Sequence, residues 1–152
     1  MSTARTNARR AAVQALYQWQ MTGQSLIEIE RQFLEEERLK EAQKSYFNEL
    51  FHGIPKHLAA IDEALTEFVD RPVDTIDPVE RAILRIGVYE LIHRLDMPYR
   101  VVLNEGINLA KDFGADGSHK YVNGILDKIA LRVRVLEDRG QRVEGRKRRS
   151  ED

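Results

Sequence analysis

A turn rich in glycine and aspartate is followed by side chains that can bind a phosphate or a base. The turn spans 113–117, and the residues after it are Ser118, His119, Lys120 and Tyr121. Ser118 is a good helix N-cap, because its hydroxyl can accept a bond from a free backbone N–H of the first turn. A helix start carries a partial positive charge that favours phosphate, lysine adds a full charge, and a tyrosine ring can stack on a base. We therefore expect an anion and base site at this helix start.

The charged residues are unevenly distributed, although the net charge is only -1. The first 20 residues carry Arg5, Arg9 and Arg10 and no acid, whereas the segment 28–41 is rich in acids. Basic residues return at 146–149. This asymmetry indicates a polyanionic partner for part of the surface. The alternative for the N-terminal arginines is a mobile chain end with solvated charges.

The sequence offers little support for an enzyme. The absence of cysteine excludes disulfides, thiolate metal sites and cysteine nucleophiles. Glu90 and Glu105 lie among apolar neighbours and could act as a general acid and base, but buried carboxylates more often pair with an arginine or satisfy helix ends. The histidines show neither an HExxH pattern nor a cysteine partner, so we expect no metal and no cofactor; they are His52, His57, His93 and His119.

Length and hydropathy place the chain among soluble globular proteins. A chain of 152 residues is long enough for one domain with a core and too short for two ordinary ones. Hydrophobic residues make up 42% of it and charged residues 32%, which suits amphipathic helices. No stretch approaches the ~18 apolar residues of a spanning helix. We expect a cytoplasmic protein without a membrane segment.

Apolar residues recur at helical spacing through nearly the whole chain, and strand-like alternation is missing apart from an ambiguous 131–135. Gly53 and Pro55 are expected to end one helix and open the next. At 77–80, Asp77 is expected to cap a helix, with Pro78 in the first helical position and Glu80 completing a capping box. The last helix is expected from Ser118 to as far as 137. The fold class is all-α, with helices expected at about 8–21, 25–34, 41–52, 55–68, 77–95, 101–113 and 118–137.

Four blocks of sequence in order resemble the NusB family of bacterial transcription antitermination factors. They are ARRAAVQALYQWQ (8–20), VERAILRIGVYEL (79–91), VVLNEGINLAKDFG (101–114) and SHKYVNGILDK (118–128). The resemblance covers the chain from about residue 9 to 130, and it implies a compact domain of about seven helices in two packed halves. We accordingly expect this helical domain at 1–138 and a basic, disordered tail at 139–152.

The resemblance also implies a function. NusB proteins are not enzymes; they form a heterodimer with NusE, a small-subunit ribosomal protein, and the pair binds boxA RNA within the antitermination complex on RNA polymerase. The alternative is a helical protein-interaction module with only incidental RNA binding. The modest net charge favours this alternative, as do Thr6 and Asn7, which stand where relatives often carry further arginines.

Residue by residue, the resemblance gives Arg5, Arg9 and Arg10 to an arginine-rich arm that contacts RNA. Arginine suits this role because its planar fork can bond a phosphate or stack on a base. Thr6 and Asn7 thin this arm relative to other family members.

At the last helix, the resemblance assigns RNA contact to Tyr121. Lys120 is expected to contact a phosphate, and His119 is expected to touch the RNA as well. The alternative for Tyr121 is core packing with its hydroxyl at the surface. Gly117 departs from the acid that some relatives carry there to adjust RNA affinity, and we do not transfer that role to Asp116.

The expected contacts with NusE are Tyr17 and Glu80. Tyr17 shares a helical stripe with Val13 and Leu16, so burial in the core is the alternative. Arg81 and Arg85 lie on one face of the helix that begins after Asp77, where they extend the partner or RNA surface or are simply solvated.

Overall fold

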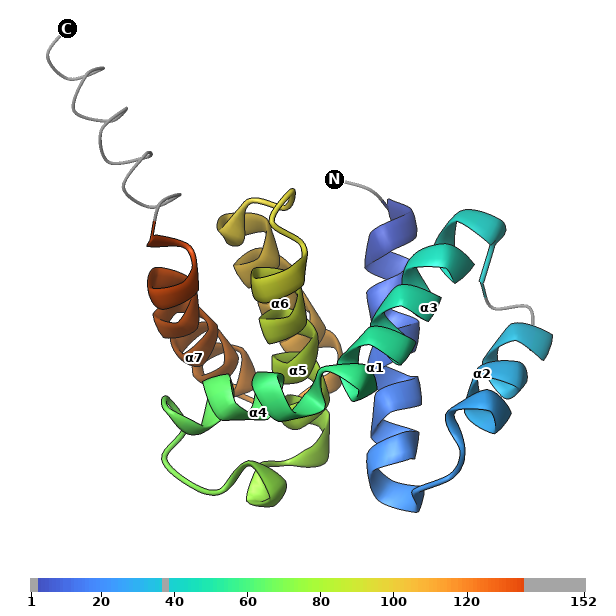
Figure 1. Ribbon diagram of the computed structural model, residues 1–152, viewed down its shortest axis with the longest axis horizontal. Coiled ribbons are helices and arrows are strands. Elements are labelled where there is room, and N and C mark those ends of the chain that lie inside the picture. The colour runs from blue at the N-terminus through green and yellow to red at the C-terminus, as the bar shows by residue number, and fades with distance from the viewer. Residues whose placement is uncertain (1–2, 37–38, 136–152) are drawn as a thin grey trace, which may run out of the picture.

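The computed structural model describes residues 3–36 and 39–135, and these residues contain only helices and the turns between them (Figure 1). The expected all-α class is confirmed. In chain order the helices are α1 (Thr3–Thr22), α2 (Leu26–Glu35), α3 (Glu41–Lys56), α4 (Leu58–Thr66), the short 3-10 helix η1 (Val73–Thr75), α5 (Pro78–His93), α6 (Tyr99–Phe113) and α7 (Ser118–Val133). Neither the expected boundary at 138 nor the expected tail falls within the described residues.

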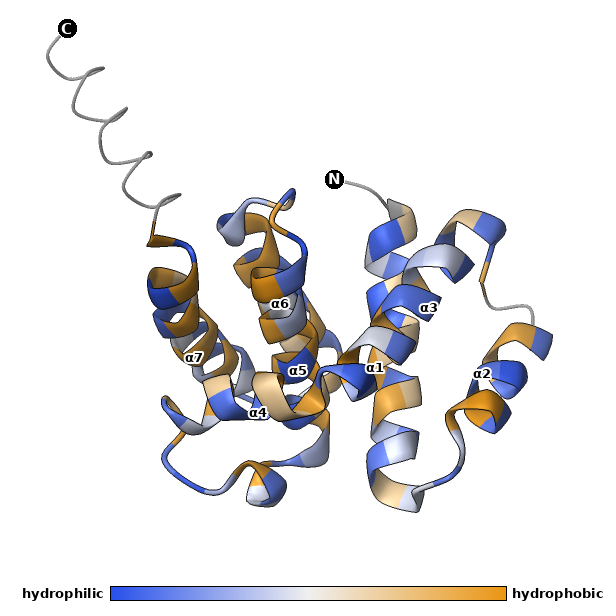
Figure 2. Cartoon of the chain, in the orientation of Figure 1, coloured by the Kyte–Doolittle hydropathy of each residue, from blue (hydrophilic) through white to orange (hydrophobic). Residues whose placement is uncertain are grey.

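The helices form two packed groups that share α5. In Figure 1, α1, α2 and α3 lie on one side of the molecule, and α5, α6 and α7 lie on the other, with α4 beneath. α1 and α3 both pack directly against α5. Figure 2 shows hydrophobic and hydrophilic residues on different sides of the same helices, as expected where each helix buries one stripe. No helix within the described ranges has both the length and the apolar character needed to cross a membrane.

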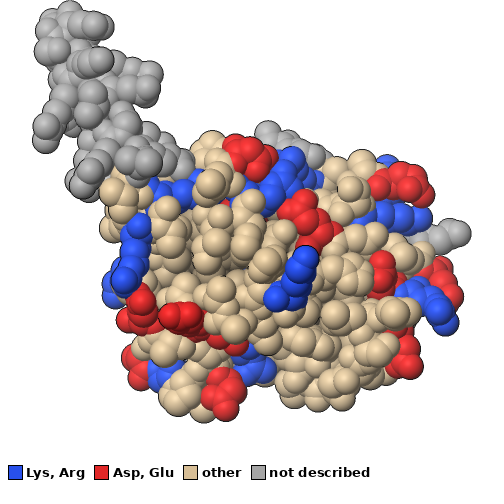
Figure 3. Space-filling view, viewed as in Figure 1, with Lys and Arg blue, Asp and Glu red and all other residues tan. Residues whose placement is uncertain are grey.

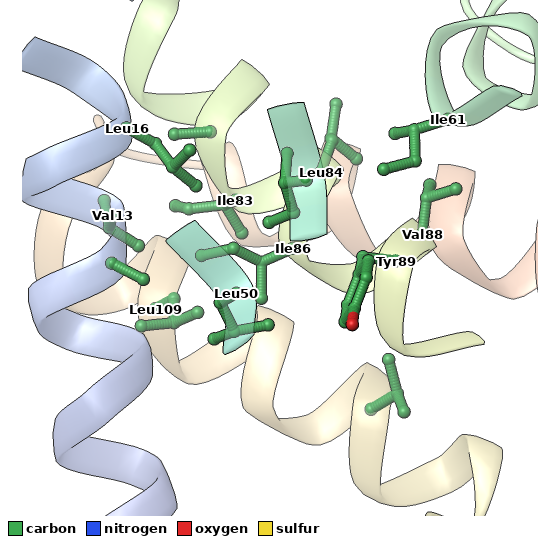
Figure 4. Close-up of a cluster of buried hydrophobic side chains, with 14 of the residues drawn as sticks. Val13, Leu16, Leu50, Ile61, Ile83, Leu84, Ile86, Val88, Tyr89 and Leu109 are labelled. Carbon is green, nitrogen blue, oxygen red and sulfur yellow. The ribbon is translucent and has the colours of Figure 1, made fainter. Parts of the chain in front are cut away.

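The centre of the core is α5, which is buried on every side from Arg81 to Leu91. Figure 4 shows its side chains among residues from α1, α3, α4 and α6, including Val13, Leu50, Ile61 and Leu109. This helix was expected to reach residue 95, but that boundary is wrong. The helix ends at His93, and Leu95 is 68% exposed.

Ser25 and Asp77 both cap the helices that follow them, and the Asp77 cap was predicted. Ser25 accepts a bond from the backbone N–H of Glu28. Asp77 accepts from the N–H groups of Val79 and Glu80 at 3.0 and 3.1 Å, with Pro78 in the first helical position. The reciprocal bond that a capping box requires, from the Asp77 N–H to the Glu80 carboxylate, is absent from the part of the chain that the structure describes.

The C-terminal end of α5 is satisfied in a way that no local pattern predicts. Arg134, just after α7, is only 4% exposed and donates to the carbonyl oxygens of Leu91 at 2.7 Å and Met97 at 2.9 Å. Helix ends leave carbonyl groups without intrahelical partners, and a guanidinium with several donors satisfies them in one step. Arg134 therefore ties α7 to the end of α5.

Two expected helix boundaries are wrong. α1 begins at Thr3 rather than near residue 8, so the N-terminal arginines lie on a helix. α3 continues through Gly53 and Pro55 to Lys56 instead of stopping before them. A Cβ on Gly53 would lie 2.7 Å from the Tyr89 ring, so this glycine allows close packing and does not end the helix. Pro55 falls in the last turn of α3, where only one backbone bond is lost.

Candidate nucleic-acid interface

The turn before α7 is built on Gly117 rather than on Ser118. Gly117 is the N-cap, with a φ of 80° in the left-handed region. The prediction that Ser118 caps the helix is therefore wrong: Ser118 is the first helical residue and is 5% exposed. A Cβ on Gly114 would lie 2.6 Å from the Ser118 hydroxyl, which shows how tightly the turn folds onto the helix start.

The three side chains that follow Ser118 differ in their surroundings. Lys120 is exposed and makes no ion pair with any described residue, and His119 is half-buried. The ring of Tyr121 packs partly against the core, and its hydroxyl is buried with no hydrogen-bond partner among the described residues. Burial raises the pKa of Tyr121, and the positive charge of Arg71 opposes that rise. Tyr121 thus combines the two alternatives: it is anchored in the core and only partly covered.

Arg71 is a member of this site that the sequence analysis did not identify. Its guanidinium carbon lies 5.6 Å from the centre of the Tyr121 ring, a cation–π distance. It also bonds the neighbouring Asp70, which lowers the pKa of that carboxyl group. The only sequence signal was a basic residue in the short loop before Pro72, and a loop position does not reveal which helix lies opposite.

Arg9 lies inside the protein rather than on a surface arm. It is 2% exposed, and its Nε donates to Glu90 at 2.9 Å while a second nitrogen lies 3.4 Å from Glu105. The Tyr46 hydroxyl donates to the same Glu90 carboxylate. Burial raises the pKa of Glu90, and the charge of Arg9 opposes that rise. The two glutamates therefore pair with an arginine, as expected for buried carboxylates, and Arg9 is not available at the surface.

Arg10, the next residue, points elsewhere and reaches the turn before α7. It pairs with Asp112, and its guanidinium lies 5.2 Å from the centre of the Phe113 ring. The Arg10 and Asp112 side chains are 43% and 44% exposed. Arg5 lies in a different environment, over the ring of Tyr46 at 5.5 Å. The structure thus brings Arg10, but not Arg9 or Arg5, beside the last residues of α6.

Tyr17 lies at the surface, in a groove between α1 and α2. The side chain is 40% exposed, whereas Val13 and Leu16 on the same helix are 2% and 0% exposed, so core burial of Tyr17 is ruled out. The groove has a volume of about 550 Å³ and an apolar floor. Its lining comes from four helices: Val13, Gln14, Tyr17, Gln18, Met21 and Thr22 of α1, Gln32 and Phe33 of α2 with Glu36 after it, Val79 of α5, and Phe113 of α6.

Glu80 connects this groove to the start of α7. It follows Val79, which lines the groove, and is half-buried. Burial raises the pKa of Glu80, the nearby Asp77 raises it further, and Arg71 opposes both. Arg71 also lies over Tyr121, so its charge acts both on Glu80 beside the groove and on Tyr121 near the start of α7. Phe113 lines the groove at the end of α6, and the Arg10 guanidinium lies over its ring.

Within the described residues there is no group of three or more His, Asp or Glu side chains that could hold a metal. On the face shown in Figure 3, lysines and arginines are interspersed with acids rather than gathered into a basic stripe.

Comparison with known proteins identifies the fold and its relatives. The model of the NusB family matches residues 6–131. The chain belongs to the NusB family. The transcription antitermination protein NusB of Nitrosococcus oceani is 50% identical over 146 residues, covering 96% of this chain and 98% of that protein. The corresponding protein of Shewanella amazonensis is 52% identical over 128 residues, covering 84% and 96%.

Solved structures of NusB proteins have the same fold. A T. maritima NusB structure is 33% identical, has a TM-score of 0.74, and covers 86% of this chain and 92% of its own. A crystal structure of the antitermination factors NusB and NusE in complex with double-stranded RNA is 29% identical, with a TM-score of 0.78 and coverage of 86% and 98%. Two packed helical halves are thus the architecture of the family.

Proposed function

We propose that this protein is a transcription antitermination factor that binds boxA RNA as a heterodimer with NusE. The observation that carries the proposal is that this one molecule offers an apolar groove edged by the exposed Tyr17 and a cationic, aromatic start of α7. An apolar groove suits a protein partner, whereas an unpaired lysine beside a tyrosine suits a nucleic acid. The names of the relatives, and the NusB–NusE–RNA complex among the similar structures, support the same assignment.

The proposed RNA contacts are Arg10, His119, Lys120 and Tyr121, with Arg5 as a more remote contact. Arg71 joins them because it lies beside Tyr121. Arg9 is left out, because its guanidinium is committed to buried carboxylates. Phosphate contacts from the cations position the RNA, and contacts with the bases supply sequence preference.

The proposed NusE contacts are Tyr17 and Glu80. Tyr17 offers a broad amphipathic ring at the edge of an apolar groove, a common anchor in protein interfaces. In this role the protein acts in the cytoplasm on RNA polymerase and has no catalytic activity of its own.

The test is a titration of boxA RNA with this protein alone and with NusE, at several salt concentrations. NusE should tighten binding to boxA more than binding to a scrambled RNA of the same length. If NusE has no effect and both RNAs bind equally, the proposal is wrong. Tight NusE binding combined with equal affinity for the two RNAs would instead support a protein-interaction module, which the interspersed surface charges also favour.

A further inference from the structure

Two arginines on α5 line a cleft that none of the contacts above uses. Arg81 and Arg85 lie one turn apart and are 9% and 8% exposed. The cleft has a volume of about 490 Å³ and lies between the C-terminal end of α1 and η1. Its other lining residues are Trp19, Gln20, Gly23 and Asp74.

The two guanidinium groups differ in how well they are paired. Arg85 donates to both oxygens of Asp62, at 3.0 and 2.8 Å, and to the side-chain oxygen of Gln20 at 2.8 Å. This is a bidentate ion pair supported by a neutral acceptor, so its charge is compensated. Arg85 therefore needs nothing from outside the molecule.

Arg81 has no such compensation. Its one hydrogen bond to a described residue runs to the backbone carbonyl oxygen of Asp74, at 2.8 Å, and no described carboxylate lies within ion-pair distance. Its Nε is buried without any partner among the described residues. Burial lowers the pKa of Arg81 and the neighbouring Arg85 lowers it further, while the more distant charges of Asp62, Asp74 and Asp77 oppose this shift. A nine-tenths buried cation with an unused donor is costly, and buried charges in proteins are normally paired.

We propose that Arg81 receives a single carboxylate from NusE, the side chain of an aspartate or glutamate, at the edge of the heterodimer interface. This inference rests on the proposed NusE partnership and adds a specific contact to it. The local geometry favours a single carboxylate, because Arg81 makes no ion pair with a described residue and its buried Nε–H lacks an acceptor among them. Asp74 also lines the cleft. It would repel a phosphate more strongly than a carboxylate, because a phosphate carries the larger negative charge.

The position of the cleft supports a protein partner. Gln20, from the cleft wall, donates to the carbonyl oxygen of Pro78 at 2.9 Å, and the next residue, Val79, lines the Tyr17 groove. A partner seated in that groove would need only a short extension to reach Arg81. The Trp19 indole in the same wall offers an apolar surface for the methylene groups of an acidic side chain.

The experiment is a titration of NusE into the wild-type protein, Arg81→Gln and Arg31→Gln. Arg31 is the matched control, because it is exposed on α2 and makes no ion pair with any described residue. Arg81→Gln should weaken NusE binding by about tenfold or more, and Arg31→Gln should leave it unchanged. Among single Asp→Asn and Glu→Gln variants of NusE, one should bind the wild-type protein more weakly but bind Arg81→Gln as well as unchanged NusE does.

A second measurement does not depend on how the variants fold. In the wild-type protein, the NMR signal of the Arg81 Nε–H should shift when NusE is added, because this donor gains an acceptor. If NusE binds the wild type but leaves this signal and the Arg81→Gln affinity unchanged, the inference is wrong and the proposed function stands. If the wild type does not bind NusE at all, the proposed function itself fails. If instead only RNA binding of the heterodimer weakens in Arg81→Gln, the occupant is a phosphate and the carboxylate assignment is wrong.

Discussion

Replacing the adjacent arginines Arg9 and Arg10 separately should give opposite results. Arg9 compensates two buried carboxylates, Glu90 at 2.9 Å and Glu105 at 3.4 Å, and all three groups are no more than 2% exposed. Removing one partner of a buried pair costs about 3–5 kcal/mol, because the remaining charge stays buried. Arg9→Gln should therefore lose a large part of the about 5–15 kcal/mol that stabilises a typical domain.

Arg10→Gln should have the reverse profile. Its pair with Asp112 is nearly half exposed, and such pairs contribute about 0–1 kcal/mol. Its stability should thus change little, while its affinity for boxA RNA in the presence of NusE should fall. The assays are urea unfolding followed by circular dichroism and RNA titration at several salt concentrations, both applied to both variants.

The pH dependence of the Arg9→Gln variant gives an internal check. Burial raises the pKa of Glu90 already in the wild type, and Arg9 opposes that rise. Without Arg9 the folded-state pKa rises further above the unfolded value. Protonated Glu90 is then tolerated in the core, so the loss of stability should be smallest in acid and should grow as the pH rises through the folded-state pKa. A second change, Glu90→Gln, should recover part of the loss at neutral pH.

One result would refute this reasoning. If Arg9→Gln unfolds at the same urea concentration as the wild type and loses more RNA affinity than Arg10→Gln, then Arg9 contacts RNA and the internal ion pair does not stabilise the fold.

Three further predictions concern the same surface. Lys120→Gln should weaken RNA binding by a similar factor for all sequences and lower the salt slope by about 0.7, and an unchanged slope would exclude a phosphate contact. Tyr17→Ala should weaken NusE binding by about tenfold or more while changing the free energy of unfolding by less than about 1 kcal/mol, and equal NusE affinity would remove Tyr17 from the interface. Gly117→Ala should destabilise the fold by about 1–2 kcal/mol in urea unfolding, because a φ of 80° is unfavourable for a residue with a Cβ. The cost comes from the backbone alone, since no atom lies within 4 Å of the added carbon. Unchanged stability would show that the turn adopts another backbone conformation.

Features that depend on neighbouring residues could be predicted from the sequence. The Asp77–Pro78 start of α5 is an example, because the cap, the proline and the first turn lie within four positions. The buried stripe of α5 followed from its apolar spacing. Ser118 was a good cap by residue type, but the left-handed conformation of Gly117 moved the helix start by one residue.

Features set by long-range contacts could not be predicted in this way. Gly53 was expected to end a helix. The close approach of the Tyr89 ring explains why a glycine stands inside α3 instead. Arg71 and Arg134 gain their roles from residues more than 35 positions away in the sequence. Arg9 is an intermediate case: it was predicted to contact RNA, although it lies four residues before Val13 and seven before Leu16, a spacing typical of the same buried stripe.

The distribution of the N-terminal arginines explains why this protein should depend on a partner to hold RNA. Of the three, Arg9 is buried, Arg5 lies over Tyr46, and Arg10 is already paired with Asp112. Lys120 also belongs to the predicted RNA contacts, and it makes no ion pair with a described residue. For single-stranded RNA each neutralised phosphate adds about 0.7 to the salt slope, so the proposed cations Arg5, Arg10, Arg71 and Lys120 together account for a slope of at most about 2.8. A steeper slope for the heterodimer would have to come from cations of NusE, and the protein alone should bind boxA weakly at physiological salt.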